Sequence, residues 1–335
     1  MGDTTNLVAY PAMQQCPNSL FRSLHQGMAR LGIACDMPHL LAATGLGFGI
    51  VAAEEWCDPA TLLWHPMQVT TPVAPLVRLL GRALHRMSLL GVACEQAWFD
   101  RDTLPALPAF VAAPQYADGV LIVWGCGAPG YAVVEWHNDR FELDSGSIAP
   151  AQLDLRGGVH CIVLRRELQV PAQGVQWHDM VSPLMMRLRV DFATPNHPLR
   201  PYQTWHCGID AWHMLAATAQ QAAPLSLIST HVARIISDYT WRLMQMREAV
   251  NRWSAPTAPH DAQMRLATAL DDCCFYAGVL YKQYGQRTLA QALTTSDGAL
   301  IASACTDIAT TLREVSAQIG MNDGDVWWAE QDSNL

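Results

Sequence analysis

The sequence predicts an α+β fold in which a domain of helices and strands precedes a helical domain. Three observations lead to this prediction. The chain has 335 residues, which is too long for one ordinary core and suits two domains. Half of the residues are hydrophobic and only 15% are charged, which indicates a large buried interior. The pattern also changes along the chain, so we place the α+β domain at 1–170, a linker or crossover at 171–203 and the helical domain at 204–335.

Helical periodicity marks three segments of the first domain. Pro17 favours the first position of a helix, so we expect a helix from there to Gly32. A second, short helix is expected at 38–44, and a glycine-rich bend follows it at 45–49. Residues 72–95 carry apolar side chains on one side and predict a third helix.

Short apolar segments then predict a sheet. A turn is expected at 137–139, between two of these segments, because Asn and Asp favour turns. Consecutive strands joined by short turns favour antiparallel pairing, which is typical of an α+β domain. The predicted strands are 119–125, 131–136, 140–144 and 159–165, and the helices predicted after them are 206–222, 225–252, 260–285, 287–295 and 297–319.

Composition argues against several classes of function. The chain has 21 basic and 30 acidic residues and no basic stripe, so we expect no nucleic-acid partner. Lys282 is the only lysine, and no P-loop pattern is present, so we expect no cofactor of the pyridoxal type and no Walker-type nucleotide hydrolysis.

The sequence also predicts a cytoplasmic protein. Residues 1–10 do not have the pattern of a signal peptide, and the longest apolar runs, such as 40–53, are too short to span a membrane. We therefore expect the ten cysteines to be reduced thiols. Because no Cys-x-x-Cys pair occurs among them, a structural zinc site is not expected.

Cys16 is the strongest candidate for a catalytic residue. It lies at the predicted start of the first helix, whose positive end favours an anion and biases a thiol toward the thiolate. A thiolate is the nucleophile of cysteine acyl chemistry. Gln14 and Gln15 precede it, and a side-chain amide there could donate to an oxyanion. The alternative is that Cys16 is a small buried residue and that the glutamines are ordinary loop residues.

Three motifs follow one another in the first domain, Cys16-Pro-Asn-Ser-Leu-Phe-Arg-Ser-Leu, Leu31-Gly-Ile and Gly45-Leu-Gly-Phe-Gly. Together they resemble the N-terminal domain of the butirosin biosynthesis protein H family. Further on, Cys207-Gly-Ile-Asp-Ala-Trp is similar to the start of the helical domain that usually follows in that family. The resemblance touches both halves of the chain. It implies a papain-like fold, related to C39 peptidases and acyltransferases, with a helical domain behind it.

The resemblance also implies roles for individual residues. Cys16 matches the nucleophile, and Asp144 matches the acid that orients the catalytic histidine. The family has this histidine directly before an aromatic-Val-Val strand, but here Gly130 stands before Tyr131. His160 is the candidate to replace it, and a hydrogen-bonded structural histidine is the alternative.

We expect a substrate to lie between the start of the first helix and the strand that begins near Tyr131. Tyr131 and the glycine bend, through Gly47 and Phe48, are therefore predicted to contact the substrate. For the bend, the alternative is close backbone packing. His137, in the predicted turn, is a further candidate for the missing imidazole, and a structural role is its alternative.

Two functions follow from these expectations. The first is a thiol-dependent acyltransferase or amide hydrolase in secondary or amine metabolism, acting on a small acyl donor such as a carrier-protein thioester. The second is a catalytically inactive binding or scaffold protein, because the histidine is replaced at Gly130. A C39-like peptidase is a third interpretation. The expected partners are a small molecule and an acyl carrier protein, and a homodimer is compatible with the pattern although no motif establishes it.

One rival constellation points to a metal. His206, Asp210 and His213 have the spacing i, i+4 and i+7, which on a helix would place two imidazoles and a carboxylate on one face. His231 and His260 are candidates for a further ligand. The alternative, a polar helix face, is the reading we prefer, and no metal is predicted.

Overall fold

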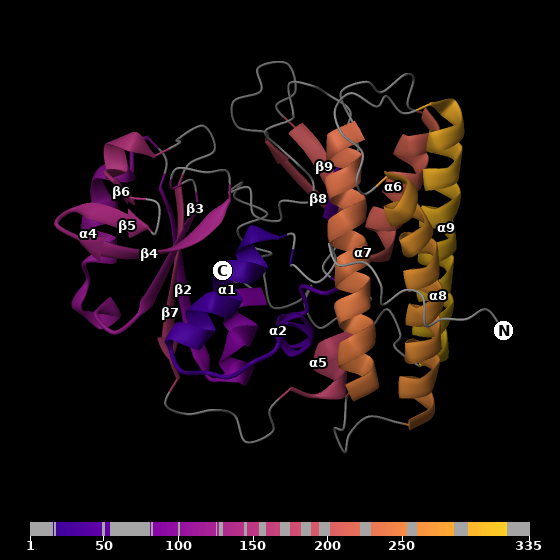
Figure 1. Cartoon of the computed structure of the whole chain (residues 1–335), viewed down its shortest axis with the longest axis horizontal. Coiled ribbons are helices and arrows are strands. Elements are labelled where there is room, and N and C mark those ends of the chain that lie inside the picture. The colour runs from indigo at the N-terminus through magenta and orange to yellow at the C-terminus, as the bar shows by residue number, and fades with distance from the viewer. Residues whose placement is uncertain are drawn as a thin grey trace.

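The structure is a computed structural model. It describes residues 16, 18–48, 51–53, 81, 83–99, 101–124, 126, 130–143, 146–153, 159–167, 175–181, 189–193, 202–221, 229–252, 260–284 and 294–319. The fold is mixed α+β, as predicted. Figure 1 shows a six-stranded sheet on one side of the molecule and long helices on the other, with α1 and α2 between them.

Helix α1 (Ser19–Arg30) confirms the first predicted helix, but it begins later than expected. Its N-cap is Asn18, whose side-chain oxygen accepts a hydrogen bond from the Leu20 N–H at 3.0 Å. Cys16 therefore precedes the cap by two residues. The apolar stripe of α1 is fully buried and consists of Leu20, Phe21, Leu24 and Met28. Helix α2 (Met37–Thr44) is capped by Asp36.

The main sheet is antiparallel throughout, with strand order β2-β7-β3-β4-β5-β6. All four predicted strands are confirmed. The predicted turn joins β4 to β5, where Asn138 and Asp139 have φ values of 49° and 59°. In chain order the strands are β2 (Val92–Phe99), β3 (Val120–Trp124), β4 (Tyr131–His137), β5 (Arg140–Leu143), β6 (Gly146–Ile148) and β7 (Val159–Arg166).

The third predicted helix, at 72–95, is wrong at its C-terminal end. Residues 83–85 are helical and η4 (Arg86–Leu90) is a 3-10 turn, but Gly91 has φ +76° and the chain then extends into β2. All eight residues of β2 pair with β7. Long-range pairing of this kind overrides a local helical pattern. Residues 72–80 lie outside the described part.

The sheet separates two cores, because side chains alternate between its faces. On β7, Val159, Cys161 and Val163 belong to the smaller core on the outer face. Ile162 and Leu164 belong to the larger core, where α1 packs on β3 and β4. His160 shares the inner face with these two residues. The inner face of the sheet is therefore the one that faces α1.

The helical part consists of α6 (Ile209–Gln221), α7 (Ser229–Arg252), α8 (His260–Tyr284) and α9 (Thr295–Gln318), and a short α5 (Trp177–Val181) precedes it. The long helices confirm predictions, although α9 begins where a separate helix at 287–295 was expected to end. The remainder of that segment is outside the described residues. Helix α9 begins with a capping box between Thr294 and Asp297.

A three-stranded sheet connects the two halves of the chain. Its strand order is β1 (Val51–Ala53), β9 (Tyr202–Cys207) and β8 (Arg189–Ala193), and both pairings are antiparallel. The predicted helix at 206–222 is therefore wrong at its start, because residues 206 and 207 belong to β9. Gly208, with φ +60°, separates this strand from α6.

The larger core contains residues of both predicted domains, including Leu20 of α1 and Leu215 of α6. No helix in the part of the chain that the structure describes is long and apolar enough to cross a membrane.

Candidate functional site

Cys16 lies at the entrance to α1 with its side chain turned inward. It is only 8% exposed, and its thiol donates a hydrogen bond to the Asn18 carbonyl at a Sγ–O distance of 3.4 Å. The guanidinium of Arg22, one turn into the helix, donates to the Cys16 carbonyl at 2.5 Å. This hydrogen bond links the backbone of Cys16 to the first turn of the helix.

This environment holds the thiol in its protonated form. Burial, with a smaller contribution from the Asp238 carboxylate, raises the pKa of Cys16 to about 12. A backbone contact with Asn18 and the charges of Arg22 and Arg242 act in the opposite direction. The sequence predicted a thiolate because it placed Cys16 at the N-cap, but Asn18 holds that position and desolvation outweighs the helix dipole.

Gly130 lies directly against the first residue of α1. A Cβ atom at Gly130 would lie 2.8 Å from Ser19 Oγ and 3.0 Å from Ser19 Cβ, and its φ of +138° is one that side chains rarely adopt. Next to it, the backbone N–H of Tyr131 donates to Ser19 Oγ at 3.0 Å. The position of the expected histidine therefore faces the helix that follows Cys16, but the backbone and the space there are suited to glycine.

His160 is buried in β7 with both ring nitrogens engaged. Nε2 donates to Gln96 Oε1 at 2.9 Å, so Nδ1 is unprotonated and accepts the Tyr131 hydroxyl at 2.6 Å. Burial lowers the pKa of His160 to about 3, so the imidazole is neutral. Among the described histidines, none forms a hydrogen bond with the Cys16 thiol. His137 is exposed at the end of β4.

The His160 network belongs to a row of side chains that crosses four neighbouring strands. Trp98 of β2 pairs with His160 of β7, and Trp124 of β3 pairs with Tyr131 of β4. The Tyr131 ring contacts Trp124 and His160 edge to face, at centroid distances of 5.3 and 5.8 Å. Sequence analysis missed Gln96. It lies two residues before Trp98 in β2, so both side chains are on the same face of the sheet, but this follows only once 92–99 is recognised as a strand.

Asp238 and Arg242 of α7 form a second polar cluster that sequence analysis missed. Arg242 Nη2 donates to Asp238 Oδ2 at 2.6 Å, and the side chains are 0% and 6% exposed. The Arg242 guanidinium also lies over the Phe21 ring of α1, 4.8 Å from its centroid. The only signal in the sequence is an i, i+4 pair of opposite charges, which usually marks a solvent-exposed helix face.

The glycine bend after α2 packs against α7. A side chain at Gly47 would clash with the sulfur of Met246, Phe48 is 2% exposed, and the Leu46 carbonyl accepts from Arg242 Nη1 at 3.5 Å. Close packing, the alternative interpretation of this bend, is therefore what the structure shows. Contact of Gly47, Phe48 or Tyr131 with a substrate stays a prediction.

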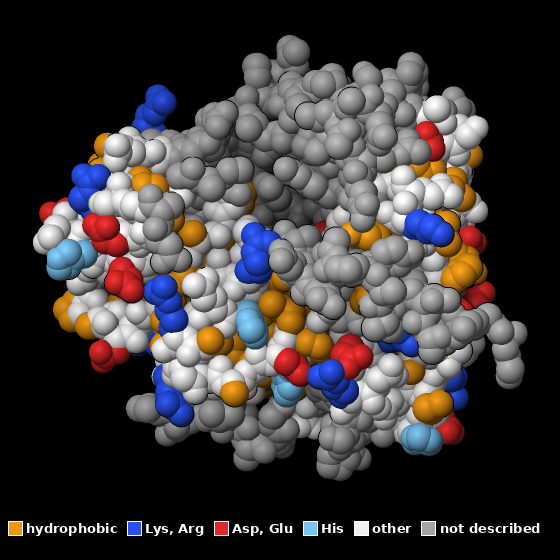
Figure 2. All heavy atoms as spheres, viewed as in Figure 1, with side chains coloured by type: hydrophobic (Ala, Val, Ile, Leu, Met, Phe, Trp, Pro, Cys, Tyr) orange, Lys and Arg blue, Asp and Glu red, His pale blue; other side chains and the backbone are white. Residues whose placement is uncertain are grey.

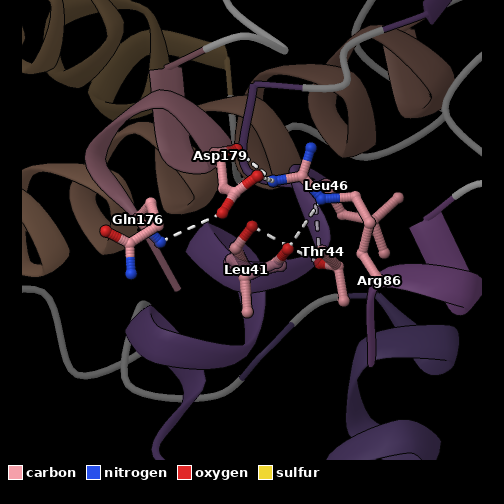
Figure 3. Close-up of polar contacts among 7 residues, drawn as sticks. Leu41, Thr44, Leu46, Arg86, Gln176 and Asp179 are labelled. Atoms are coloured by element: carbon pink, nitrogen blue, oxygen red, sulfur yellow. Dashed lines mark hydrogen bonds and ion pairs between the residues drawn. The ribbon is translucent and has the colours of Figure 1, made fainter. Parts of the chain in front are cut away.

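A buried arginine fixes the end of α2 from which the bend departs. Figure 3 shows Arg86 reaching between that end and α5. Its Nε donates to the Ala43 carbonyl at 2.9 Å, and Nη2 donates to the Asp179 carbonyl. The Asp179 carboxylate lies 3.8 Å from the same guanidinium and accepts from the Gln176 N–H at 3.0 Å. Burial lowers the pKa of Arg86, and the charge of Asp179 opposes this shift.

The metal constellation is not formed. His206 lies in β9, whereas Asp210 and His213 lie in α6, so the three do not share a helix face. Within the described ranges, no group of three His, Cys, Asp or Glu side chains could hold a metal ion. Gln14, Gln15 and Asp144 are outside these ranges, so their predicted roles are untested.

The surface adds two features. Figure 2 shows basic and acidic side chains interspersed over the described part of this face. An open groove of about 320 Å³ lies between α8 and α9 and contains no cysteine or histidine. Its lining includes Met264, Arg265, Asp272 and Glu314.

The fold and the site together define an α+β protein with a buried cysteine at the entrance to its first helix. No family model matches the chain, and no curated protein matches it. The resemblance to the butirosin biosynthesis protein H family therefore stays a prediction.

Proposed function

We propose that the chain is a papain-like protein that has lost cysteine catalysis and acts by binding, as a catalytically inactive binding or scaffold protein. The observation that carries this proposal is the contact of Gly130 with Ser19, where a Cβ atom would lie 2.8 Å from the hydroxyl oxygen. A histidine at this position would collide with the helix start. The imidazole that a cysteine nucleophile needs has no place there.

The chemistry of the neighbouring groups supports the same proposal. Cysteine acyl transfer needs a thiolate and a base that takes and returns a proton. The pKa of Cys16 is raised to about 12 by burial, so almost no thiolate forms near pH 7. In this arrangement His160 is not available as the base, because both of its nitrogens are hydrogen-bonded, to Gln96 and to Tyr131.

The ligands that we propose are those implied by the family resemblance, a small acyl-bearing molecule or an acyl carrier protein. In a papain-like fold the ligand would lie between the start of α1 and the strand that begins at Tyr131, and the Tyr131 N–H donates to Ser19 of α1 at that place. The α+β framework would then supply a shaped surface without a nucleophile.

The test combines alkylation with turnover. We expect Cys16 to react with iodoacetamide no faster than the partly exposed Cys35 at pH 7.5, measured by peptide mass spectrometry. We also expect that p-nitrophenyl acetate and acetyl-coenzyme A release no stoichiometric burst of product. A burst that Cys16→Ala abolishes would refute the proposal.

The second candidate is the thiol-dependent acyltransferase or amide hydrolase. It is favoured by one observation, that His160 lies on the same face of the sheet as α1, the helix that follows Cys16. In this case His160 would have to exchange a hydrogen bond with Gln96 or Tyr131 for one with the thiol. His160→Asn would then abolish the burst described above, and without a burst this candidate fails.

A further inference from the structure

The buried charge pair of α7 contacts each segment that surrounds Cys16. Arg242 bonds to the Leu46 carbonyl of the glycine bend and stacks over Phe21 of α1. Asp238 interacts with the side chain of Asn18, which caps α1. One turn of α7 therefore holds the bend, the helix and the helix cap together, although more than 190 residues separate it from all three.

The charged groups that face Cys16 come from two helices. They are Asp238 and Arg242 of α7 and Arg22 of α1, which bonds to the Cys16 carbonyl. None of them comes from β4, the strand that the family resemblance implicates. Two of these three charged groups thus come from the helical part of the chain.

We infer that Asp238 and Arg242 are positioning residues that hold the start of α1 against α7 and keep the Cys16 thiol buried. The inference goes beyond the proposed function and does not depend on it. It applies equally to an inactive protein and to an enzyme whose thiol is released by a ligand.

Alkylation by iodoacetamide reports on the thiol directly. The Cys16 thiolate attacks the methylene carbon, the carbon–iodine bond breaks, iodide leaves, and the thiol proton passes to water. The rate is measured for each cysteine by peptide mass spectrometry at pH 7 to 10. Cys305, which is 3% exposed within α9, reports global unfolding in the same sample.

Asp238→Asn removes the negative charge beside the thiol and releases the cap. We expect Cys16 to react about tenfold faster, the effect of a shift of about one pKa unit, with a smaller change at Cys305. Asp238→Glu keeps the charge and should return the rate to within about threefold of the original. Asp271→Asn is the matched control, because it breaks the ion pair of Arg247 with α8 without facing Cys16.

The double variant Asp238→Leu with Arg242→Met separates an effect on the position of Cys16 from an effect on the stability of the whole protein. Apolar replacement of a buried ion pair is often neutral or stabilising. We therefore expect unfolding in urea near that of the original chain, while Cys16 still reacts about tenfold faster because the cap is released.

Two results would overturn the inference. One is a stable double variant whose Cys16 reacts at the original rate. The other, which applies even where the double variant does not fold, is an equal rise at Cys16 and Cys305 in Asp238→Asn. Both results are rates of alkylation. The proposed function is instead decided by the burst of product from the acyl substrates, so failure of the one can be distinguished from failure of the other.

Discussion

Gly130→Ala is expected to destabilise the protein through two separable effects. The first is backbone strain, because alanine would adopt φ +138°. Such a conformation costs about 1 to 3 kcal/mol. The second is the collision of the new methyl group with Ser19 Oγ at 2.8 Å and Ser19 Cβ at 3.0 Å. Overpacking of this kind costs about 1 to 3 kcal/mol more.

Gly146 supplies a matched control for the strain. It has φ +131°, close to that of Gly130, but a Cβ atom there would meet nothing within 4 Å. Gly146→Ala should therefore cost only the strain, about 1 to 3 kcal/mol, and Gly130→Ala about 2 to 6 kcal/mol. The difference between the two variants measures the contact with the helix start.

The assay is urea unfolding at 25 °C followed by circular dichroism, with the free energy of unfolding taken from linear extrapolation. Ser19→Gly removes both atoms of the collision. In a double-mutant cycle it should recover the steric part of the loss at Gly130→Ala and leave the strain. If Gly130→Ala is no more destabilising than Gly146→Ala, the space at this position does not exclude a side chain. The main support for an inactive site then disappears.

Two further predictions concern buried groups that can carry a charge, the Asp238–Arg242 pair and His160. Arg242→Met leaves the Asp238 carboxylate unpaired among buried side chains and should cost about 3 to 5 kcal/mol of unfolding free energy. A loss below 1 kcal/mol in urea would show that the pair is not desolvated. The pKa of His160 is lowered to about 3 by burial, so below about pH 6.5 the unfolded chain binds a proton that the folded chain does not. Stability from this group is therefore present above pH 6.5 and is lost as the pH falls toward 3, by roughly 3 to 5 kcal/mol. His160→Gln should flatten this part of the pH dependence in urea unfolding at pH 7, 5 and 4, and an unchanged slope would contradict the assignment.

Local patterns predicted the elements whose causes are local. The stripe of α1 and the Asn138–Asp139 turn are fixed by neighbouring residues, and both are confirmed. Strand β2 was missed because its pairing with β7 joins residues that are far apart in the sequence, from Phe99 with Val159 to Val92 with Arg166. In the sequence, the apolar pattern of the preceding helix continues across Gly91. In the folded chain, the left-handed conformation of Gly91 ends the helical segment before β2.

The candidate site was only partly predictable for the same reason. Sequence analysis singled out Cys16, Gly130, Tyr131 and His160, and the structure links all four to α1 or to one another. It missed Asp238 and Arg242, because a charge pair four residues apart on a helix has the same pattern whether it is exposed or buried. Only the packing of α7 against α1 distinguishes the two cases.

The contacts on the two sides of α1 lead to one interpretation of the site. On the sheet side, Ser19 accepts from Tyr131 and leaves room only for a glycine at position 130. On the α7 side, Asp238 interacts with Asn18, the cap of the same helix, and Arg242 lies over the ring of Phe21. A nucleophile needs a base on one side and an open approach on the other, and here both sides are occupied by contacts that fix the helix. The residues around Cys16 are arranged to hold the start of α1 in place, and this is the feature on which the proposed binding role depends.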